Sequence, residues 1–185
     1  LLDAHPTVLI PIIMETLRSE WLAKEGRINV FLYHYRVSNN PLHPKIAAKL
    51  FKIICRTKAG TLNSMDCGLS ILQRMSLSAS QKKRLRKWAI TLFDRCLEYD
   101  NRDFAIRYLA VLFQVDPTDA LQKMQSWIKS VKLEEQNALA VQIIGKFFNR
   151  NDGLVVNCLK NAPIATLKEL VLQAYCLVRP IDDVK

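Results

Sequence analysis

The sequence predicts an all-α protein built from antiparallel helical hairpins. Apolar residues recur at helical spacing along most of the 185 residues. Glycine is scarce: the chain has 5 glycines, under half of the usual ~7 %. Few glycines leave few tight turns, which argues against a β-sandwich or a β-barrel. Half of the residues are hydrophobic, so the chain can bury a substantial core.

The N-terminal region begins with an amphipathic pattern that predicts a helix over residues 8–24, ended by Gly26. Residues 27–37 would suit a strand by propensity, but a lone strand has no partner here, so we predict a helix. Residues 38–41 (Ser-Asn-Asn-Pro) are predicted to form a loop.

Three further helices are predicted before the middle of the chain. Pro44 begins a helix over 45–58, and Gly60 is expected as its C-cap. A shorter helix over 63–75 and a longer one over 80–99 follow.

The second half of the chain has a regular rhythm of predicted helices. Alternate helices begin near residues 80, 117 and 153, and their partners begin near 102, 134 and 164. Short connections make each pair antiparallel, and a regular step of 30 to 37 residues is typical of stacked helical hairpins. The predicted helices are 102–115, 117–131, 134–149, 153–160 and 164–178.

The partner helices share a similar composition, rich in Ala, Leu, Ile and Val. It is seen in AIRYLAVL at 105–112, LAVQII at 139–144 and LVLQAYCL at 170–177. These segments resemble the inner helices of HEAT/armadillo-type repeats, over about half of the chain. The resemblance implies a HEAT-like α-solenoid, and an irregular helical bundle is the alternative architecture.

Charge is distributed unevenly along the chain. The sequence has 27 Lys and Arg against 17 Asp and Glu, a net charge of +10. Residues 1–92 carry the whole surplus, and residues 93–185 are balanced. We therefore expect one helical domain over 1–185 with a basic and a neutral half. Because the chain opens at Leu1 without an initiator methionine, we also expect it to be a fragment of a larger protein.

Two basic segments account for most of the surplus. In the helix predicted from residue 45, basic residues follow one another at steps of four, three and four, which places them on one face. In the second segment, 82–87, five charges open a helix, where they oppose the helix dipole. The candidate anion-binding residues are Lys45, Lys49, Lys52, Arg56, Lys82, Lys83, Arg84, Arg86 and Lys87.

Three interpretations of these basic residues remain open. They could contact nucleic-acid phosphates, with Trp88 or the pair Tyr33 and Tyr35 available for stacking. They could dock on an acidic protein surface, or they could form a solvated face without a binding role. Residues 82–87 also fit a nuclear-import patch.

Sequence motifs of catalysis, metal binding and membrane insertion are missing. No glycine-rich phosphate loop can be written, the 3 histidines have no metal-ligand spacing, and no nucleophile motif is present. The 5 cysteines lack zinc spacing and suit a reducing compartment. The longest apolar run, residues 8–14, is far shorter than the ~20 residues of a spanning helix. We therefore expect no catalytic residue, metal, cofactor or membrane partner.

The sequence thus predicts a non-enzymatic interaction or scaffold domain of a larger intracellular protein, cytoplasmic or nuclear. Its expected partners are nucleic acid or an acidic protein surface, and other domains of the same protein or complex. The alternative is a protein-docking or sensor module without a nucleic-acid role. Such modules occur beside NTPase or nuclease domains, an analogy at the level of fold alone.

Overall fold

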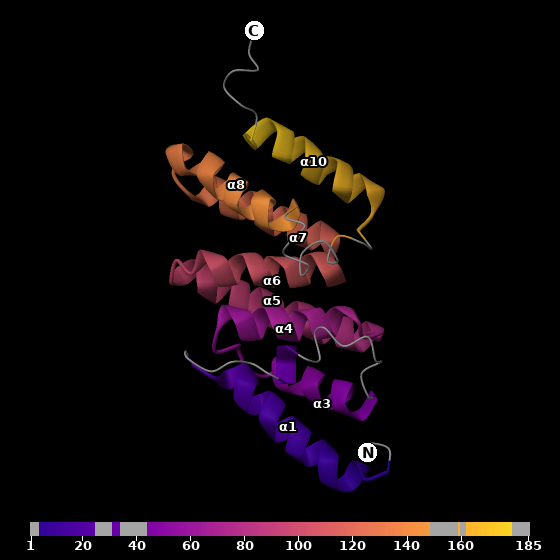
Figure 1. Cartoon of the computed structure of the whole chain (residues 1–185). Coiled ribbons are helices and arrows are strands. Elements are labelled where there is room, and N and C mark those ends of the chain that lie inside the picture. Colours follow the sequence, from indigo (N-terminus) through magenta and orange to yellow (C-terminus); the bar gives the residue numbers. More distant parts are fainter. Residues whose placement is uncertain (1–3, 25–30, 34–43, 149–158, 160–161, 179–185) are drawn as a thin grey trace. The chain divides into compact units, whose positions relative to one another are not determined.

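A computed structural model of the chain describes residues 4–24, 31–33, 44–148, 159 and 162–178 (Figure 1). These residues form helices and the turns between them, and no strand occurs among them. The prediction of an all-α protein is confirmed for this part of the chain. The contacts group into two units, Leu1–Arg84 and Leu85–Lys185, and the division falls inside one helix.

The helices of both units are labelled in Figure 1. The first unit contains α1 (Pro6–Leu22), α3 (Pro44–Ile54), α4 (Leu62–Gln73) and the start of α5 (Ala79–Glu98), and residues 31–33 are also helical. The second unit contains the rest of α5 together with α6 (Arg102–Val115), α7 (Pro117–Ser130), α8 (Leu133–Phe148) and α10 (Ile164–Val178).

Most predicted helix ends agree with the structure to within about two residues, but α3 does not. It ends at Ile54, so the predicted extension to residue 58 is wrong, and Gly60 is not its C-cap. Of the predicted helix 27–37, residues 31–33 are helical and the others lie outside the described residues. Gly26, the loop 38–41 and the predicted helix 153–160, apart from Leu159, also lie outside them.

The early end of α3 has a tertiary cause. The Thr57 hydroxyl donates to the carbonyl of Ile53 at 2.8 Å and accepts the indole N–H of the fully buried Trp21 at 2.9 Å. The amide of Arg56 bonds to the carbonyl of Ile53, which tightens the last turn. The chain leaves α3 here because Thr57 is held against α1.

Two glycines let the backbone of the first unit close around Trp21. The amide of Gly60 donates to the carbonyl of Trp21 at 2.8 Å, and a Cβ at Gly60 would overlap the backbone of Ala23. Gly68 in α4 lies under the indole ring, where a Cβ would overlap the ring itself. The hydroxyl of Ser64 donates to the carbonyl of Glu20 at 2.9 Å. Together these contacts fix α1, the end of α3 and α4 to one another.

The second unit is built around α6. Among the residues of this helix, Ala105, Ile106 and the run from Tyr108 to Phe113 are buried. It packs on α7 and α8, and α10 packs on α7 and α8 as well. Edge-to-face aromatic pairs strengthen the core, such as Phe113 with Phe147 at a centroid distance of 5.1 Å.

The start of α7 follows the sequence prediction. Asp116 is the N-cap, and its side chain accepts the amide of Asp119 at 3.3 Å, with Pro117 in the first turn. No helix among the described residues has the length and apolar character needed to cross a membrane.

Replacing Gly60 by alanine is expected to destabilise the first unit by about 1–3 kcal/mol. The added methyl group would overlap the backbone carbonyl of Ala23, which cannot move without displacing the end of α1. The free energy of unfolding would be measured by urea titration with circular dichroism.

Gly145 provides the matched control in α8. A Cβ there meets no atom within 4 Å, so Gly145→Ala should stabilise the protein by about 0.5–1 kcal/mol through helix propensity. Equal stability of the Gly60→Ala variant and the wild type would contradict the close approach at Gly60.

Candidate functional site

Helix α3 presents a row of lysines on the face opposite its buried side. Lys45, Lys49 and Lys52 follow one another at steps of four and three, and all three are exposed. No acidic residue lies in the first turn of α3. The buried residues of the helix are Ile46, Ala47, Leu50, Phe51 and Ile54.

Arg56 lies in the turn that follows α3 and not on the predicted helical face. It lies two residues beyond the end of α3, so helical spacing from Lys52 does not place it. It is nevertheless exposed, as is Lys58. Both flank Thr57, whose contact with Trp21 fixes this turn. Lys58 is therefore a second exposed cation in this turn, and helical spacing alone did not identify it.

The start of α5 is a capping box that the sequence contains but that our prediction missed. The hydroxyl of Ser78 accepts the amide of Gln81 at 3.3 Å, and the amide of Ser78 donates to the Gln81 side chain at 2.8 Å. Because the reciprocal partner is a glutamine, the first turn carries no negative charge. The side chains of Lys82, Lys83 and Arg84 are exposed directly after it.

Arg84 connects the two basic segments within the first unit. Burial raises the pKa of the Cys55 thiol to about 11, and the nearby guanidinium of Arg84 lowers it in part. Arg84, in the first turns of α5, is therefore near Cys55, and Arg56 follows Cys55 in the chain. No local pattern in the sequence brings Arg84 near Cys55.

Most of the predicted site residues form no ion pair with the described residues. Eight of the nine have no carboxylate of the described residues within 4.0 Å of their side-chain nitrogens. They are Lys45, Lys49, Lys52, Arg56, Lys82, Lys83, Arg84 and Lys87. Lys87 lies in the second unit. We call the other seven residues, all in the first unit, together with the exposed Lys58, the basic surface.

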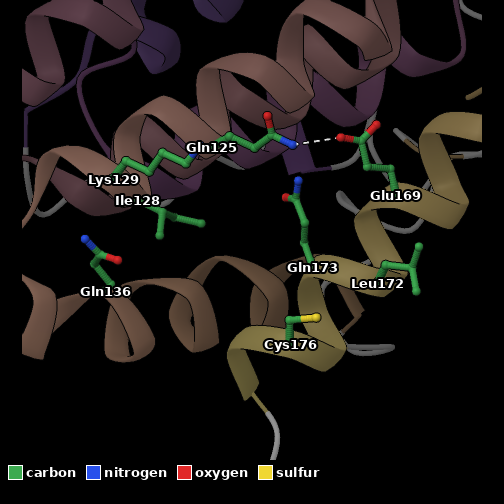
Figure 2. A pocket seen from close by; sticks show the side chains of 8 residues that line it. All are labelled: Gln125, Ile128, Lys129, Gln136, Glu169, Leu172, Gln173 and Cys176. Atoms are coloured by element: carbon green, nitrogen blue, oxygen red, sulfur yellow. Dashed lines mark hydrogen bonds between the residues drawn. The ribbon is translucent and has the colours of Figure 1, made fainter.

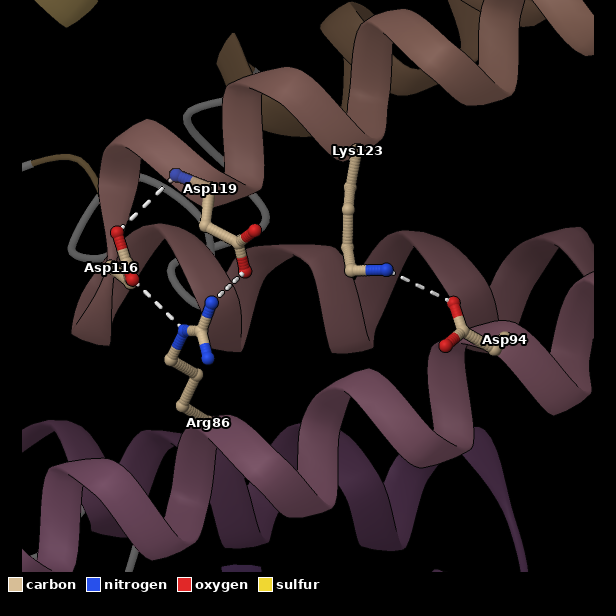
Figure 3. Close-up of polar contacts among 5 residues, drawn as sticks. All are labelled: Arg86, Asp94, Asp116, Asp119 and Lys123. Carbon is tan, nitrogen blue, oxygen red and sulfur yellow. Dashed lines mark hydrogen bonds and ion pairs between the residues drawn. The ribbon is translucent and has the colours of Figure 1, made fainter.

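Arg86 is the ninth predicted residue and has a structural contact. Its Nε lies 2.9 Å from Asp116 Oδ2, and its second nitrogen lies 3.0 Å from Asp119 Oδ2 (Figure 3). Nearby, Lys123 pairs with Asp94 at 3.2 Å. Arg86 thus ties α5 to the N-terminus of α7, where both carboxylates lie, and its charge is matched within the second unit.

The aromatic residues suggested for stacking differ in exposure. Trp88 is only 8 % exposed and packs edge-to-face on Tyr108 at 5.2 Å, so the suggestion that it is available for stacking is wrong. Tyr33 is 51 % exposed, and Tyr35 lies outside the described residues. Phe31, which the sequence analysis did not single out, is 43 % exposed.

A cavity of about 450 Å³ lies among α7, α8 and α10 of the second unit (Figure 2). Gln125 donates to Glu169 at 2.9 Å at its edge, and the buried Oε1 of Gln173 has no hydrogen-bond partner among the described residues. Ile128 and Leu172 supply apolar lining. No histidine lines the cavity, and no cluster suited to a metal ion occurs in the described part of the chain.

Comparisons of the chain with known proteins found no relative from which a function could be inferred. No protein-family model, curated protein or solved structure gives a significant match. The geometry of the basic surface is therefore the principal guide to function.

Replacing Arg84 by methionine is expected to slow alkylation of Cys55 at a fixed alkaline pH. Loss of the guanidinium removes the charge that favours the thiolate, so the pKa of Cys55 should rise above its value of about 11. The rate would be measured by iodoacetamide labelling and peptide mass spectrometry. Lys82→Met removes the same charge elsewhere on α5, and equal slowing by both variants would contradict a close contact between Arg84 and Cys55.

The same pKa shift has a consequence for stability. The folded thiol stays neutral while the thiol of the unfolded chain ionises at its ordinary value of 9.0. The contribution of Cys55 to stability is therefore lost as the pH rises from about 9 to about 11.

Proposed function

We propose that this chain is a non-enzymatic helical-repeat interaction domain that binds nucleic acid through the basic surface of its first unit. The observation that carries the proposal is the row of Lys45, Lys49 and Lys52. These side chains are exposed on one face of α3, without a carboxylate partner among the described residues.

The spacing of the row suits a polyanion. From Lys45 to Lys52 the helix rises by about 10 Å at 1.5 Å per residue. One strand of a duplex carries about three phosphates over such a length, at 3.4 Å of axis for each. Lysine contacts to successive phosphates release condensed counterions, which supplies most of the affinity in sequence-independent binding.

The cost of this arrangement to the folded chain also favours an anionic partner. Lysines three and four residues apart on one helix face repel one another by roughly 0.2–0.5 kcal/mol for each pair. Cations in the first turns of α5 oppose its dipole, and the capping residue Gln81 does not offset them. Phosphates across the surface would relieve both unfavourable terms.

The second unit is proposed to extend a scaffold of stacked helical hairpins, the arrangement of HEAT-like repeats. Support comes from the short connections and the packing order. A single residue, Asp116, separates α6 from α7, and α7 packs on both α6 and α8. An irregular bundle is the alternative arrangement. In either case we propose an intracellular setting, cytoplasmic or nuclear, with contacts to other domains of the same protein or complex.

A protein-docking module is the second candidate function, and one observation favours it. Helix α10 exposes Val171, Leu172 and Tyr175, each by more than half of its surface. Contiguous exposed apolar side chains commonly mark protein interaction sites. In that case the basic surface would meet an acidic protein rather than nucleic acid.

The triple variant Lys45→Gln, Lys49→Gln, Lys52→Gln is expected to weaken nucleic-acid binding and to reduce its salt dependence. Each lost phosphate contact lowers the slope of log K against log salt by about 1 unit, so the slope should fall by about 2 to 3. Fluorescence polarisation with a labelled oligonucleotide, titrated at several salt concentrations, measures both quantities.

A matched control removes three exposed lysines of the second unit, in the variant Lys129→Gln, Lys132→Gln, Lys168→Gln. This control variant has the same net charge as the α3 triple variant. An equal loss of affinity in both variants would show that binding follows total charge and not the lysine row on α3. No binding by the wild type at low salt would overturn the nucleic-acid proposal and leave the protein-docking candidate.

A further inference from the structure

Residues 31–33 of the first unit present two aromatic side chains around a buried anchor. Leu32 is fully buried, while Phe31 and Tyr33 on either side of it are 43 % and 51 % exposed. Successive residues of a helical turn are rotated by about 100°. The two rings therefore flank the anchor on opposite sides.

The backbone of this short turn is held in place by Glu20 of α1. One carboxylate oxygen accepts the amide of Phe31 at 3.0 Å, and the other accepts the amide of Leu32 at 2.8 Å. Bonds from amides to a carboxylate are stronger than bonds between neutral groups. The turn is thus held by a carboxylate that binds its backbone and by the buried Leu32, which fixes the backbone from which both rings project.

The Glu20 carboxylate lies next to the contacts that position the turn after α3, where two cations of the basic surface lie. Glu20 precedes Trp21, whose indole N–H donates to the Thr57 hydroxyl at 2.9 Å. Arg56 and Lys58 are the exposed neighbours of Thr57 in the chain. The turn that carries the two aromatic residues and the turn that carries these cations are therefore both held by the end of α1.

We infer that Phe31 and Tyr33 stack on unpaired bases, so that the ligand of the first unit is a single-stranded nucleic acid. The inference rests on the proposed function, because the cations of the basic surface would hold the phosphates of the same strand. Base faces are available for stacking on aromatic side chains when the strand is unpaired, whereas in a duplex they are covered by neighbouring pairs. Stacking of this kind is tolerant of sequence.

The decisive comparison uses three labelled probes of equal length: oligo(dT), the same backbone without bases, and a duplex. At low salt the wild type should bind oligo(dT) at least tenfold more tightly than the abasic strand, because each of the two stacked bases contributes about fivefold or more. The double variant Phe31→Leu, Tyr33→Leu keeps apolar side chains but removes both π-faces. It should bind oligo(dT) and the abasic strand about equally, with its affinity for the abasic strand unchanged.

A second double variant, Val8→Ala, Ile12→Ala, is the control, since it shortens two exposed apolar side chains of α1. It should retain the preference for oligo(dT). Equal affinity of the wild type for oligo(dT) and for the abasic strand would overturn the stacking inference while leaving phosphate binding intact. Failure of the wild type to bind any of the three probes at low salt would instead overturn the proposed function. The first comparison needs the wild type alone, so it decides the inference even if a variant fails to fold.

Discussion

The burial of one tryptophan fixes α1, the turn after α3 and α4 to one another in the first unit. Trp21 is fully enclosed, and its indole N–H, its carbonyl and its ring each make a contact with a different segment: Thr57, Gly60 and Gly68. A large aromatic side chain contributes a substantial apolar area, and its N–H must find a partner when it is buried. Thr57 is that partner, so the requirement for one hydrogen bond ends α3 and places the turn with Arg56 and Lys58. The placement of these two cations therefore depends on the hydrogen bond that the buried Trp21 N–H requires.

Charged side chains are arranged differently in the two units. In the second unit, Arg86 pairs with two carboxylates, Lys123 pairs with Asp94, and Arg102 pairs with Asp100 and Glu135. All of these pairs except Arg102 with Asp100 connect two helices, although exposed pairs of this kind stabilise a protein only slightly. In the first unit, burial of the apolar face of α3 supports a row of exposed lysines on the same helix. The proposed function assigns the electrostatic contact with a partner to the first unit and the scaffold role to the second.

The sequence predicts those features that depend on local spacing and fails where a distant contact decides. Lysines at steps of three and four identify the exposed face of α3. Within a helix, the directions of side chains near one another in the sequence are fixed by the helix geometry. The end of α3 depends on Trp21, which lies 36 residues before Thr57, and no local pattern encodes that bond. The burial of Trp88 likewise depends on Tyr108 of another helix. The capping box at Ser78 is a different case, because the serine and glutamine three residues apart are visible in the sequence.

Binding and stability should be coupled at such a surface. Repulsion along α3 and the unfavourable dipole interaction in α5 are properties of the folded state, and they weaken in the unfolded chain, where the charges separate. A ligand that binds only the folded unit stabilises it in proportion to the logarithm of its concentration relative to its dissociation constant. A polyanion would add to this effect by screening the cations from one another. The same placement of charge that lowers the stability of the free unit would thus favour the proposed complex, which gives a physical reason for the absence of acidic residues from the first turns of α3 and α5.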